Sequence, residues 1–239
     1  MADWFEQWFD GDYAALYAHR DAGEATLAVA TALLEAPELG RGPVLDLACG
    51  AGRHLGELRK TNPSAFGLDL SAALLGLAPD GLRPWLLRGD MRRLPVKAGL
   101  SGITLWFTPF GYFADAENEA LLRALANLLR SGGVLLIDYL NAAELRRTLV
   151  PEDTLERAGI RVKSRRRIEQ GRVIKEMELL RLDTGETRQA RESVHIYEPG
   201  ELEAMAARAG LKLRKTMGRY DGSAFDERSP RWIALFEKG

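Results

Sequence analysis

Short apolar runs alternate with amphipathic segments through the middle of the chain. The runs cover about residues 43–47, 65–69, 85–88, 103–108 and 134–138. Helical spacing of apolar residues separates them, as in residues 53–60 and in the leucine stripe that follows Asp115, which is expected to cap that helix. Strands that alternate with helices through short links predict a parallel sheet covered by helices on both faces.

Residues 160–169 break this rhythm with strict alternation of side-chain character. A period of two predicts a strand. Turn signals at Gln170-Gly171 and at Asp183-Thr184-Gly185 bound two more, at about 172–182 and 187–197. We therefore expect an antiparallel insert of about three strands that covers the carboxyl ends of the main strands as a lid. A helix from Pro199 to Gly210 and two strands, about 211–219 and 232–237, complete the chain.

Residues 4–36 have a helical pattern that Pro37 ends. The segment begins with a run of rings: Trp4, Phe5, Trp8, Phe9, Tyr13 and Tyr17. Two interpretations stay open, because the rings can cap a core or form one wall of a ligand pocket. We expect one domain in four parts: a helical cap (1–40), a ligand-binding core (41–150), the insert (151–198) and a completion of the sheet (199–239).

Composition narrows the class of protein. The chain has 239 residues, enough for one sizeable core, and a net charge of −1, which gives no general attraction to nucleic acid or membrane. No apolar run approaches the ~20 residues of a membrane helix. The start lacks the features of a signal peptide, and one cysteine cannot form an internal disulfide. We expect a cytoplasmic protein.

The first apolar run leads into a glycine turn, Asp46-x-x-x-Gly50-x-Gly52, and then into a helix. Glycine lets the backbone turn sharply close to a ligand. A dinucleotide site would need a third glycine, but Leu55 stands in its place, and Asp46 would repel a phosphate. The acid suits a cationic ligand such as S-adenosylmethionine, and Leu55 disfavours an NAD(P)-dependent oxidoreductase.

Two further acids follow the next strands. Asp69 ends the second strand, where a carboxylate can accept hydrogen bonds from both hydroxyls of a ribose. Asp90 follows the third, where it can accept from an adenine amino group while Met91 packs on the ring. Either acid alone could equally be a helix cap or a loop residue, but three strand-end acids together favour a nucleoside-type ligand.

These motifs resemble those of the class I S-adenosylmethionine-dependent methyltransferases. Residues 44–58 are similar to the family's first motif, 66–78 to its second, 86–96 to its adenine-contact segment and 108–113 to the floor of its methyl-transfer site. Residues 13–20, 220–225 and 229–231 resemble a small bacterial and archaeal subfamily with an antiparallel insert. Ala48 stands where the family often has glycine, and Ser101-Gly102 where it usually has an aromatic residue and an acid.

The resemblance implies a Rossmann-like, doubly wound, seven-stranded α/β sheet, mostly parallel, with S-adenosylmethionine as cofactor and no metal. The residues expected to bind the cofactor are Tyr17, Arg20, Asp46, Ala48, Gly50, Gly52, Asp69, Leu70, Asp90, Met91, Phe107 and Thr108. We expect methyl transfer to nitrogen or oxygen of a small molecule by a monomer or homodimer. Candidate catalytic residues are Tyr112, His195 and Tyr197.

A nucleic-acid methyltransferase or an RNA-binding relative is the alternative. Residues 157–175 carry eight basic side chains against one acid, Glu169. Such a stripe could follow a phosphate backbone. More often a charged outer strand face is solvated and protects a sheet edge. We therefore expect neither a nucleic acid nor a membrane as partner.

Overall fold

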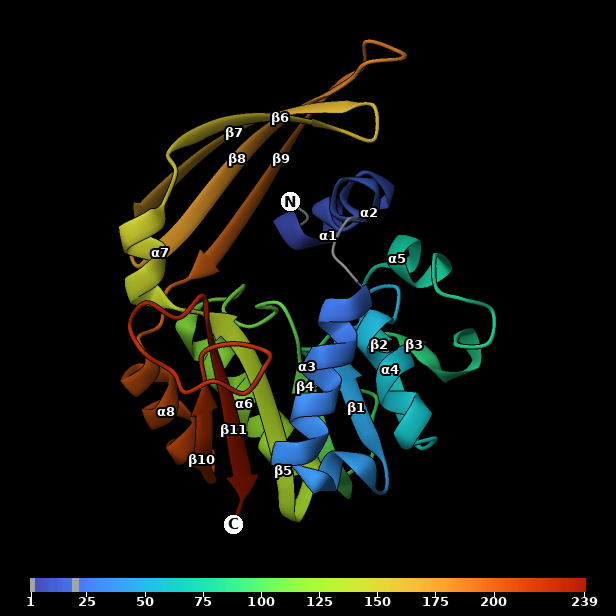
Figure 1. The fold of residues 1–239 in the computed structure, drawn as a ribbon, viewed down its shortest axis with the longest axis vertical. Helices are drawn as coiled ribbons and strands as arrows, with labels where there is room; N and C mark the ends of the chain where they lie inside the picture. Colours follow the sequence, from blue (N-terminus) through green and yellow to red (C-terminus); the bar gives the residue numbers. More distant parts are fainter. Residues whose placement is uncertain (1–2, 19–21) are drawn as a thin grey trace.

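A seven-stranded sheet and a separate four-stranded sheet organise the chain (Figure 1). The structure is a computed structural model that describes residues 3–18 and 22–239. In the main sheet the strand order is β10-β11-β5-β4-β1-β2-β3. The bounds are β1 Val44–Leu47, β2 Ala65–Asp69, β3 Leu86–Arg88, β4 Leu100–Leu105, β5 Leu129–Leu140, β10 Leu211–Met217 and β11 Arg231–Lys238. Strands β1 to β5 are parallel, and β11 is antiparallel to both of its neighbours, so the predicted seven-stranded, mostly parallel sheet is confirmed.

Helices cover both faces of this sheet. Helices α6 (Asp115–Leu128) and α8 (Pro199–Arg208) pack their apolar stripes on one face, against residues such as Leu45 and Ile137. Helices α3 (Ala22–Glu35) and α4 (Arg53–Thr61) pack on the other face, against Val44 and Leu136. The short α5 (Ala72–Gly76) lies near β2 and β3, and two 3-10 helices span Pro37–Gly40 and Arg83–Trp85.

Several boundaries differ from the sequence-based expectation. The fourth strand ends at Leu105 rather than near residue 108, because Phe107 and Thr108 adopt left-handed backbone angles instead of the extended angles of a strand. Asp115 is the first residue of α6 instead of its cap, so that prediction was wrong. The backbone N–H of Ala114 is bonded by Glu117 at 3.3 Å. Ser71 caps α5 as a helix-capping serine should, accepting from the Leu74 N–H at 3.1 Å.

The insert is an antiparallel sheet in the order β6-β7-β8-β9, one strand more than expected. Its strands are β6 Glu152–Arg157, β7 Ile160–Glu169, β8 Arg172–Arg181 and β9 Thr187–His195. Strand β6 was missed because its sequence, EDTLER, has one apolar residue and therefore no hydrophobic alternation. We call this sheet the lid, because it lies over the carboxyl ends of the parallel strands (Figure 1). It is reached through α7 (Ala142–Thr148), directly after β5.

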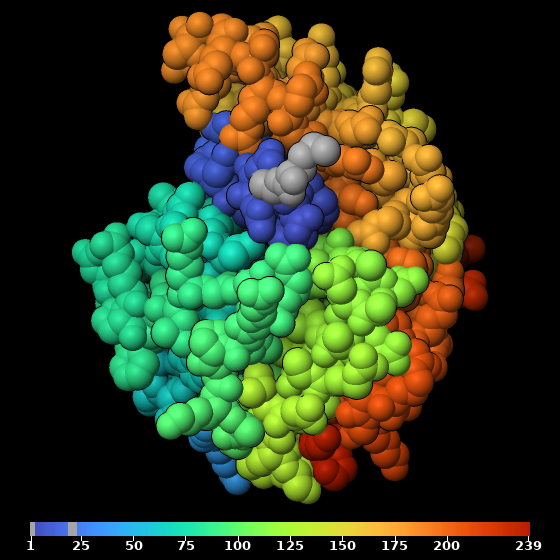
Figure 2. All heavy atoms as spheres, turned by 180° about the vertical axis from the view of Figure 1, so that it is seen from behind, coloured from blue at the N-terminus to red at the C-terminus, as the bar shows by residue number. Residues whose placement is uncertain are grey.

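Two short helices, α1 (Trp4–Trp8) and α2 (Gly11–Tyr17), fill the space between the lid and the main sheet (Figures 1 and 2). Asp10 separates them, and its side chain caps α2 by accepting from the N–H groups of Asp12 and Tyr13. Trp8 and Leu16 are buried against lid residues such as Val162. Across the described part of the chain, every helix is too short or too polar to span a bilayer.

Candidate functional site

A cavity of about 310 Å³ lies at the carboxyl edge of the main sheet, below α1 and α2. Most residues expected to bind a cofactor line it: Tyr17, Asp46, Ala48, Gly50, Asp69, Leu70, Asp90, Met91 and Phe107. Of the candidate catalytic residues, Tyr112 lines it, whereas His195 and Tyr197 do not. Gly52 and Thr108 lie just outside the lining, and Arg20 falls outside the described residues. The structure therefore brings the three strand-end acids together around one cavity.

The turn after β1 approaches the cavity through left-handed backbone angles. The φ angles are +58° at Ala48, +55° at Gly50 and +80° at Gly52. The Gly50 N–H donates to Asp69 Oδ2 at 2.7 Å, and the Ser71 N–H donates to Oδ1 at 2.8 Å. Burial raises the pKa of Asp69, and these backbone donors partly oppose that shift. Asp69 thus holds the glycine turn against the end of β2, and its carboxylate faces the cavity.

Asp46 presents a buried carboxylate oxygen that lacks a partner. Its Oδ1 accepts from the Thr104 hydroxyl at 3.0 Å, but Oδ2 has no hydrogen-bond partner among the described residues. Burial raises the pKa of this carboxyl to about 7. A buried acceptor left without a donor is costly, so it marks a place for a ligand that supplies one. A cationic group that donates hydrogen bonds meets this need, so the carboxylate fits the ammonium-bearing end of S-adenosylmethionine.

Asp90 is tied to a residue that the sequence analysis missed, Arg92. The Arg92 guanidinium donates to both carboxylate oxygens of Asp90, at 3.1 Å to Oδ1 and at 2.9 Å and 2.7 Å to Oδ2. It also donates to Asp3 Oδ2 at 3.1 Å. Burial raises the pKa of Asp90, but the Arg92 contacts outweigh it and hold that pKa below its usual range. The same guanidinium lies over the rings of Phe5 and Phe113. Arg92 therefore connects the third-strand acid to the chain entering α1.

Aromatic rings from α1 and α2 form one wall of the cavity. Phe9 and Tyr13 meet edge to face at 4.9 Å between centroids, and Tyr13 contacts Tyr17 at 4.7 Å. Phe9 also stacks on Tyr112 at 6.0 Å. The Tyr17 hydroxyl accepts from Lys175 Nζ of the lid at 3.0 Å. Both interpretations of the aromatic run hold, because Trp8 is core while the other rings named here face the cavity.

Three residues line the cavity that were not among those expected to bind the cofactor: Arg53, His54 and Trp106. The His54 imidazole stacks on Trp106 at 4.8 Å between centroids, and burial lowers its pKa to about 3, so it is neutral at pH 7. The Arg53 guanidinium lies 4.8 Å from the centroid of the Phe107 ring. The sequence does not predict these ring contacts, because residues 53–54 and 106–107 are far apart in the chain.

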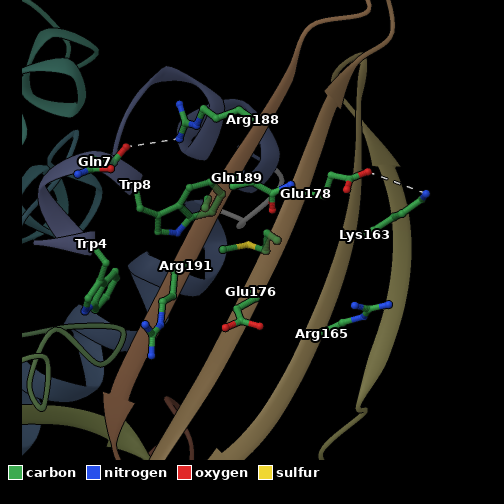
Figure 3. Close-up of a pocket in the computed structure, with 12 residues that line it drawn as sticks. Trp4, Gln7, Trp8, Lys163, Arg165, Glu176, Glu178, Arg188, Gln189 and Arg191 are labelled. Atoms are coloured by element: carbon green, nitrogen blue, oxygen red, sulfur yellow. Dashed lines mark hydrogen bonds and ion pairs between the residues drawn. The ribbon is translucent and has the colours of Figure 1, made fainter.

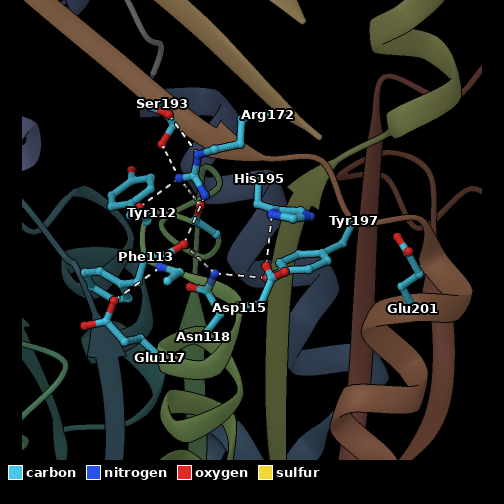
Figure 4. A network of polar contacts seen from close by, with 12 residues as sticks. Tyr112, Phe113, Asp115, Glu117, Asn118, Arg172, Ser193, His195, Tyr197 and Glu201 are labelled. Carbon is cyan, nitrogen blue, oxygen red and sulfur yellow. Dashed lines mark hydrogen bonds and ion pairs between the residues drawn. The ribbon is translucent and has the colours of Figure 1, made fainter. Parts of the chain in front are cut away.

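His195 and Tyr197 belong to a polar network at the base of the lid (Figure 4). The Tyr197 hydroxyl donates to Asp115 Oδ1 at 2.7 Å, and His195 Nδ1 lies 3.0 Å from the same oxygen. Burial lowers the pKa of His195 and raises that of Tyr197. Arg172 donates to the carbonyl oxygens of Gly111, Tyr112 and Phe113 at 2.8–3.0 Å. The network joins the lid to the loop that carries Tyr112.

A larger hollow of about 700 Å³ lies between α1 and the lid, lined by Trp4 and Trp8 and by strand residues such as Arg191 (Figure 3). The Trp4 ring contacts Tyr112, a residue of the first cavity's lining, at 4.8 Å between centroids.

The basic stripe on β7 is compensated by acids on neighbouring strands. Each of its four outward side chains has a carboxylate partner: Arg161 with Glu156 (2.5 Å), Lys163 with Glu178 (4.0 Å), Arg165 with Glu152 (3.2 Å) and Arg167 with Glu176 (2.8 Å). A phosphate backbone would have to compete with these carboxylates. The stripe therefore gives no support to the nucleic-acid alternative.

Comparison with known proteins agrees with this geometry. Residues 44–133 match the family model of the methyltransferase domain. The chain is 33% identical over 125 residues to dTDP-3-amino-3,6-dideoxy-alpha-D-glucopyranose N,N-dimethyltransferase of Streptomyces fradiae. It is 33% identical over 97 residues to dTDP-3-amino-3,4,6-trideoxy-alpha-D-glucopyranose N,N-dimethyltransferase of Streptomyces venezuelae. These matches cover 50% and 40% of the chain but only 46% and 41% of the relatives, less than half of their length.

Solved structures match over nearly the whole chain. An S-adenosylmethionine-dependent methyltransferase from Clostridium acetobutylicum has a TM-score of 0.82 at 19% identity, with 95% of each chain covered. The sugar N-methyltransferase from Streptoalloteichus has a TM-score of 0.74 at 23% identity, with 95% of this chain and 92% of its own covered. At these identities the likeness shows the fold alone. The matches cover 95% of this chain, so they include the lid as well as the main sheet.

Proposed function

We propose that the protein transfers a methyl group from S-adenosylmethionine to an amino nitrogen of a small molecule. Residues 44–133 match the family model of the methyltransferase domain, and the chain shares its fold with an S-adenosylmethionine-dependent methyltransferase. The observation that carries the proposal is the buried, unpartnered Oδ2 of Asp46 in a cavity lined by two more acids. The two relatives at 33% identity carry the name of amino-sugar N,N-dimethyltransferases, which supports nitrogen as the acceptor atom.

The lining residues have complementary parts in holding the cofactor. Asp46 and the glycine turn would hold its ammonium and sulfonium end, Asp69 its ribose hydroxyls, and Asp90 with Met91 its adenine. When bound, S-adenosylmethionine supplies a methyl carbon already activated by the adjacent sulfonium. The protein then has to align the acceptor and exclude water. The rings of Phe9, Tyr13 and Tyr112 provide an apolar enclosure for this purpose.

A small acceptor fits the enclosure better than a polymer does. Helices α1 and α2 and the lid cover the carboxyl edge of the sheet, and the basic stripe is already paired with acids. Amino sugars are the first class to test, because the named relatives act on them. Of the three candidate catalytic residues, Tyr112 is the one that lines the cavity, so we expect it to contact the acceptor.

The test combines binding and turnover. Calorimetry should detect binding of S-adenosylhomocysteine by the purified protein and no comparable binding of NAD. Methyl-labelled S-adenosylmethionine should then label amino sugars but not the matched sugars in which a hydroxyl replaces the amine. Labelling of the hydroxyl compounds alone would contradict nitrogen as the acceptor, and labelling of RNA instead would contradict the small-molecule class.

A further inference from the structure

The loop after β10 and the first residue of β11 each contribute a side chain that contacts a buried carboxylate near the cofactor cavity. Asp138, near the carboxyl end of β5, is fully buried. It accepts a hydrogen bond from the Tyr220 hydroxyl at 2.6 Å and one from Arg231 Nε at 2.7 Å. Both donors come from the stretches 220–225 and 229–231, to which the proposed function gives no role.

The same aspartate holds the backbone that follows β4. The Phe107 N–H donates to Asp138 Oδ2 at 2.7 Å, and the Thr108 N–H donates to the Asp138 carbonyl oxygen at 2.9 Å. Arg231 Nη2 also donates to Thr108 Oγ1 at 2.7 Å. Phe107 and Thr108 have φ angles of +65° and +62°. Two consecutive left-handed residues other than glycine persist only where the surroundings impose that conformation.

The direction of these peptide groups determines which backbone atoms point away from Asp138. The described chain has no cis peptide bond, so each N–H and its carbonyl point in opposite directions across the peptide plane. Because the N–H groups of Phe107 and Thr108 point to Asp138, the carbonyl groups of Trp106 and Phe107 point away from it. Trp106 and Phe107 both line the cavity. A lining residue whose carbonyl group points away from Asp138 can present that oxygen to the cavity as a hydrogen-bond acceptor.

We propose that Tyr220 and Arg231 are positioning residues for the ammonium group of the cofactor, acting through Asp138 on the backbone of Phe107 and Thr108. The inference rests on the proposed function, since it concerns how the same cavity holds its cofactor. The Arg231 guanidinium strengthens the arrangement, because it also lies 5.5 Å from the centroid of the Phe107 ring. A segment more than 100 residues beyond the glycine turn in the sequence thereby shapes the cofactor site.

The test uses two ligands that differ in the group concerned. S-adenosylhomocysteine carries the ammonium, whereas 5′-methylthioadenosine has the same nucleoside and lacks the amino-acid part. Calorimetry on Tyr220→Phe should show about tenfold weaker binding of S-adenosylhomocysteine, the order expected for a lost hydrogen bond to a charged group, and unchanged binding of 5′-methylthioadenosine. Arg231→Gln should lose more, and Arg231→Lys less, because lysine keeps the charge opposite Asp138.

Arg219→Gln is the matched control, since Arg219 is an exposed neighbour of Tyr220, and its affinities should equal those of the unaltered protein. Thermal unfolding checks that each variant is folded at the temperature of the titration. Equal losses for the two ligands would reveal a merely structural role and overturn the inference, as would full affinity for S-adenosylhomocysteine in folded Tyr220→Phe. If the unaltered protein bound neither ligand, the proposed function itself would fall, which is a different result.

Discussion

Two buried side chains of the cavity are shifted in opposite directions. Burial raises the pKa of Asp46 to about 7 and lowers that of His54 to about 3. Between about pH 4 and 6.5 the folded state holds a proton on Asp46 that the unfolded chain lacks, which makes stability fall as pH rises. Over the same window the unfolded chain holds a proton on His54 that the folded state lacks, which makes stability rise. The two contributions largely cancel.

Replacing one of these groups should make the other group's effect on the pH dependence of stability measurable. In Asp46→Asn the falling contribution is gone, so the melting temperature should climb more steeply between pH 4 and 6.5 than it does in the unaltered protein. A series of thermal melts across that window measures the slopes. Parallel slopes for the two proteins would show that the pKa of Asp46 is not raised.

The raised pKa of Asp46 should also make ligand affinity depend on pH. An ammonium group beside Asp46 favours the ionised form of its carboxyl, so the affinity for S-adenosylhomocysteine should increase as pH rises toward 7 and level off above about pH 8. Asp46→Asn should weaken binding by roughly 1.5–3 kcal/mol at pH 8 and remove this pH dependence. Calorimetry near pH 6.5 in two buffers of different ionisation enthalpy should detect proton release in the unaltered protein alone.

Ala48 occupies a left-handed position in the glycine turn, with φ +58°. A side chain costs ~1–2 kcal/mol in that conformation, whereas glycine adopts it freely at an entropic cost of ~0.5–1 kcal/mol. Ala48→Gly should therefore raise the melting temperature by a few degrees. Ala51→Gly is the control, because Ala51 is not among the left-handed residues, and it should lower the melting temperature. A melting temperature for Ala48→Gly below that of the unaltered protein would contradict strain at this position.

At the scale of elements, hydrophobic periodicity predicted most of the sheet and the position of the lid. The apolar stripes of α6 and α8 and the buried strands were visible because their pattern matches their burial. Strand β6 was hidden, since it is an edge strand with mostly polar residues. The strand-end acids were predictable because parallel strands end at one edge. The contacts of Arg172, and that of Arg92 with Asp3, were not predictable, because they join segments distant in the sequence.

The base of the lid depends on one guanidinium. Arg172 donates to three successive carbonyl oxygens, and the Gly111 carbonyl also accepts from the His195 N–H at 2.8 Å. Arg172→Ala removes one donor from each of these three carbonyl oxygens, so it should destabilise the protein by ~1–3 kcal/mol. It should also raise the KM for the acceptor, because the loop carries Tyr112. Thermal unfolding and steady-state kinetics measure the two effects.

Arg167→Ala provides the comparison, since Arg167 pairs with Glu176 on the exposed face of the lid. An exposed pair contributes ~0–1 kcal/mol. If the two variants lost equal stability, the special role of Arg172 would be refuted.

At the scale of the whole molecule, charge is balanced locally as well as in total. The chain has 33 basic and 34 acidic side chains, and the basic stripe of β7 meets acids from β6 and β8. Sequence order shows only the stripe, because the pairing partners come from other strands. Replacing Arg161, Lys163, Arg165 and Arg167 together with Gln should leave turnover of the acceptor nearly unchanged. Loss of tight, salt-sensitive RNA binding in that variant would instead restore the nucleic-acid interpretation.

The chain enters the lid after β5 and returns to the main fold at α8, and the two ends of this segment are in contact. Arg146 of α7 pairs with Glu198, and the Tyr139 hydroxyl of β5 donates to the His195 carbonyl oxygen. Because the ends of the segment are held together, its length can change at little cost in chain entropy. The lid is therefore a segment whose two ends stay in place whatever its length. A change in the length or sequence of the lid can therefore leave the strands that build the cofactor cavity as they are.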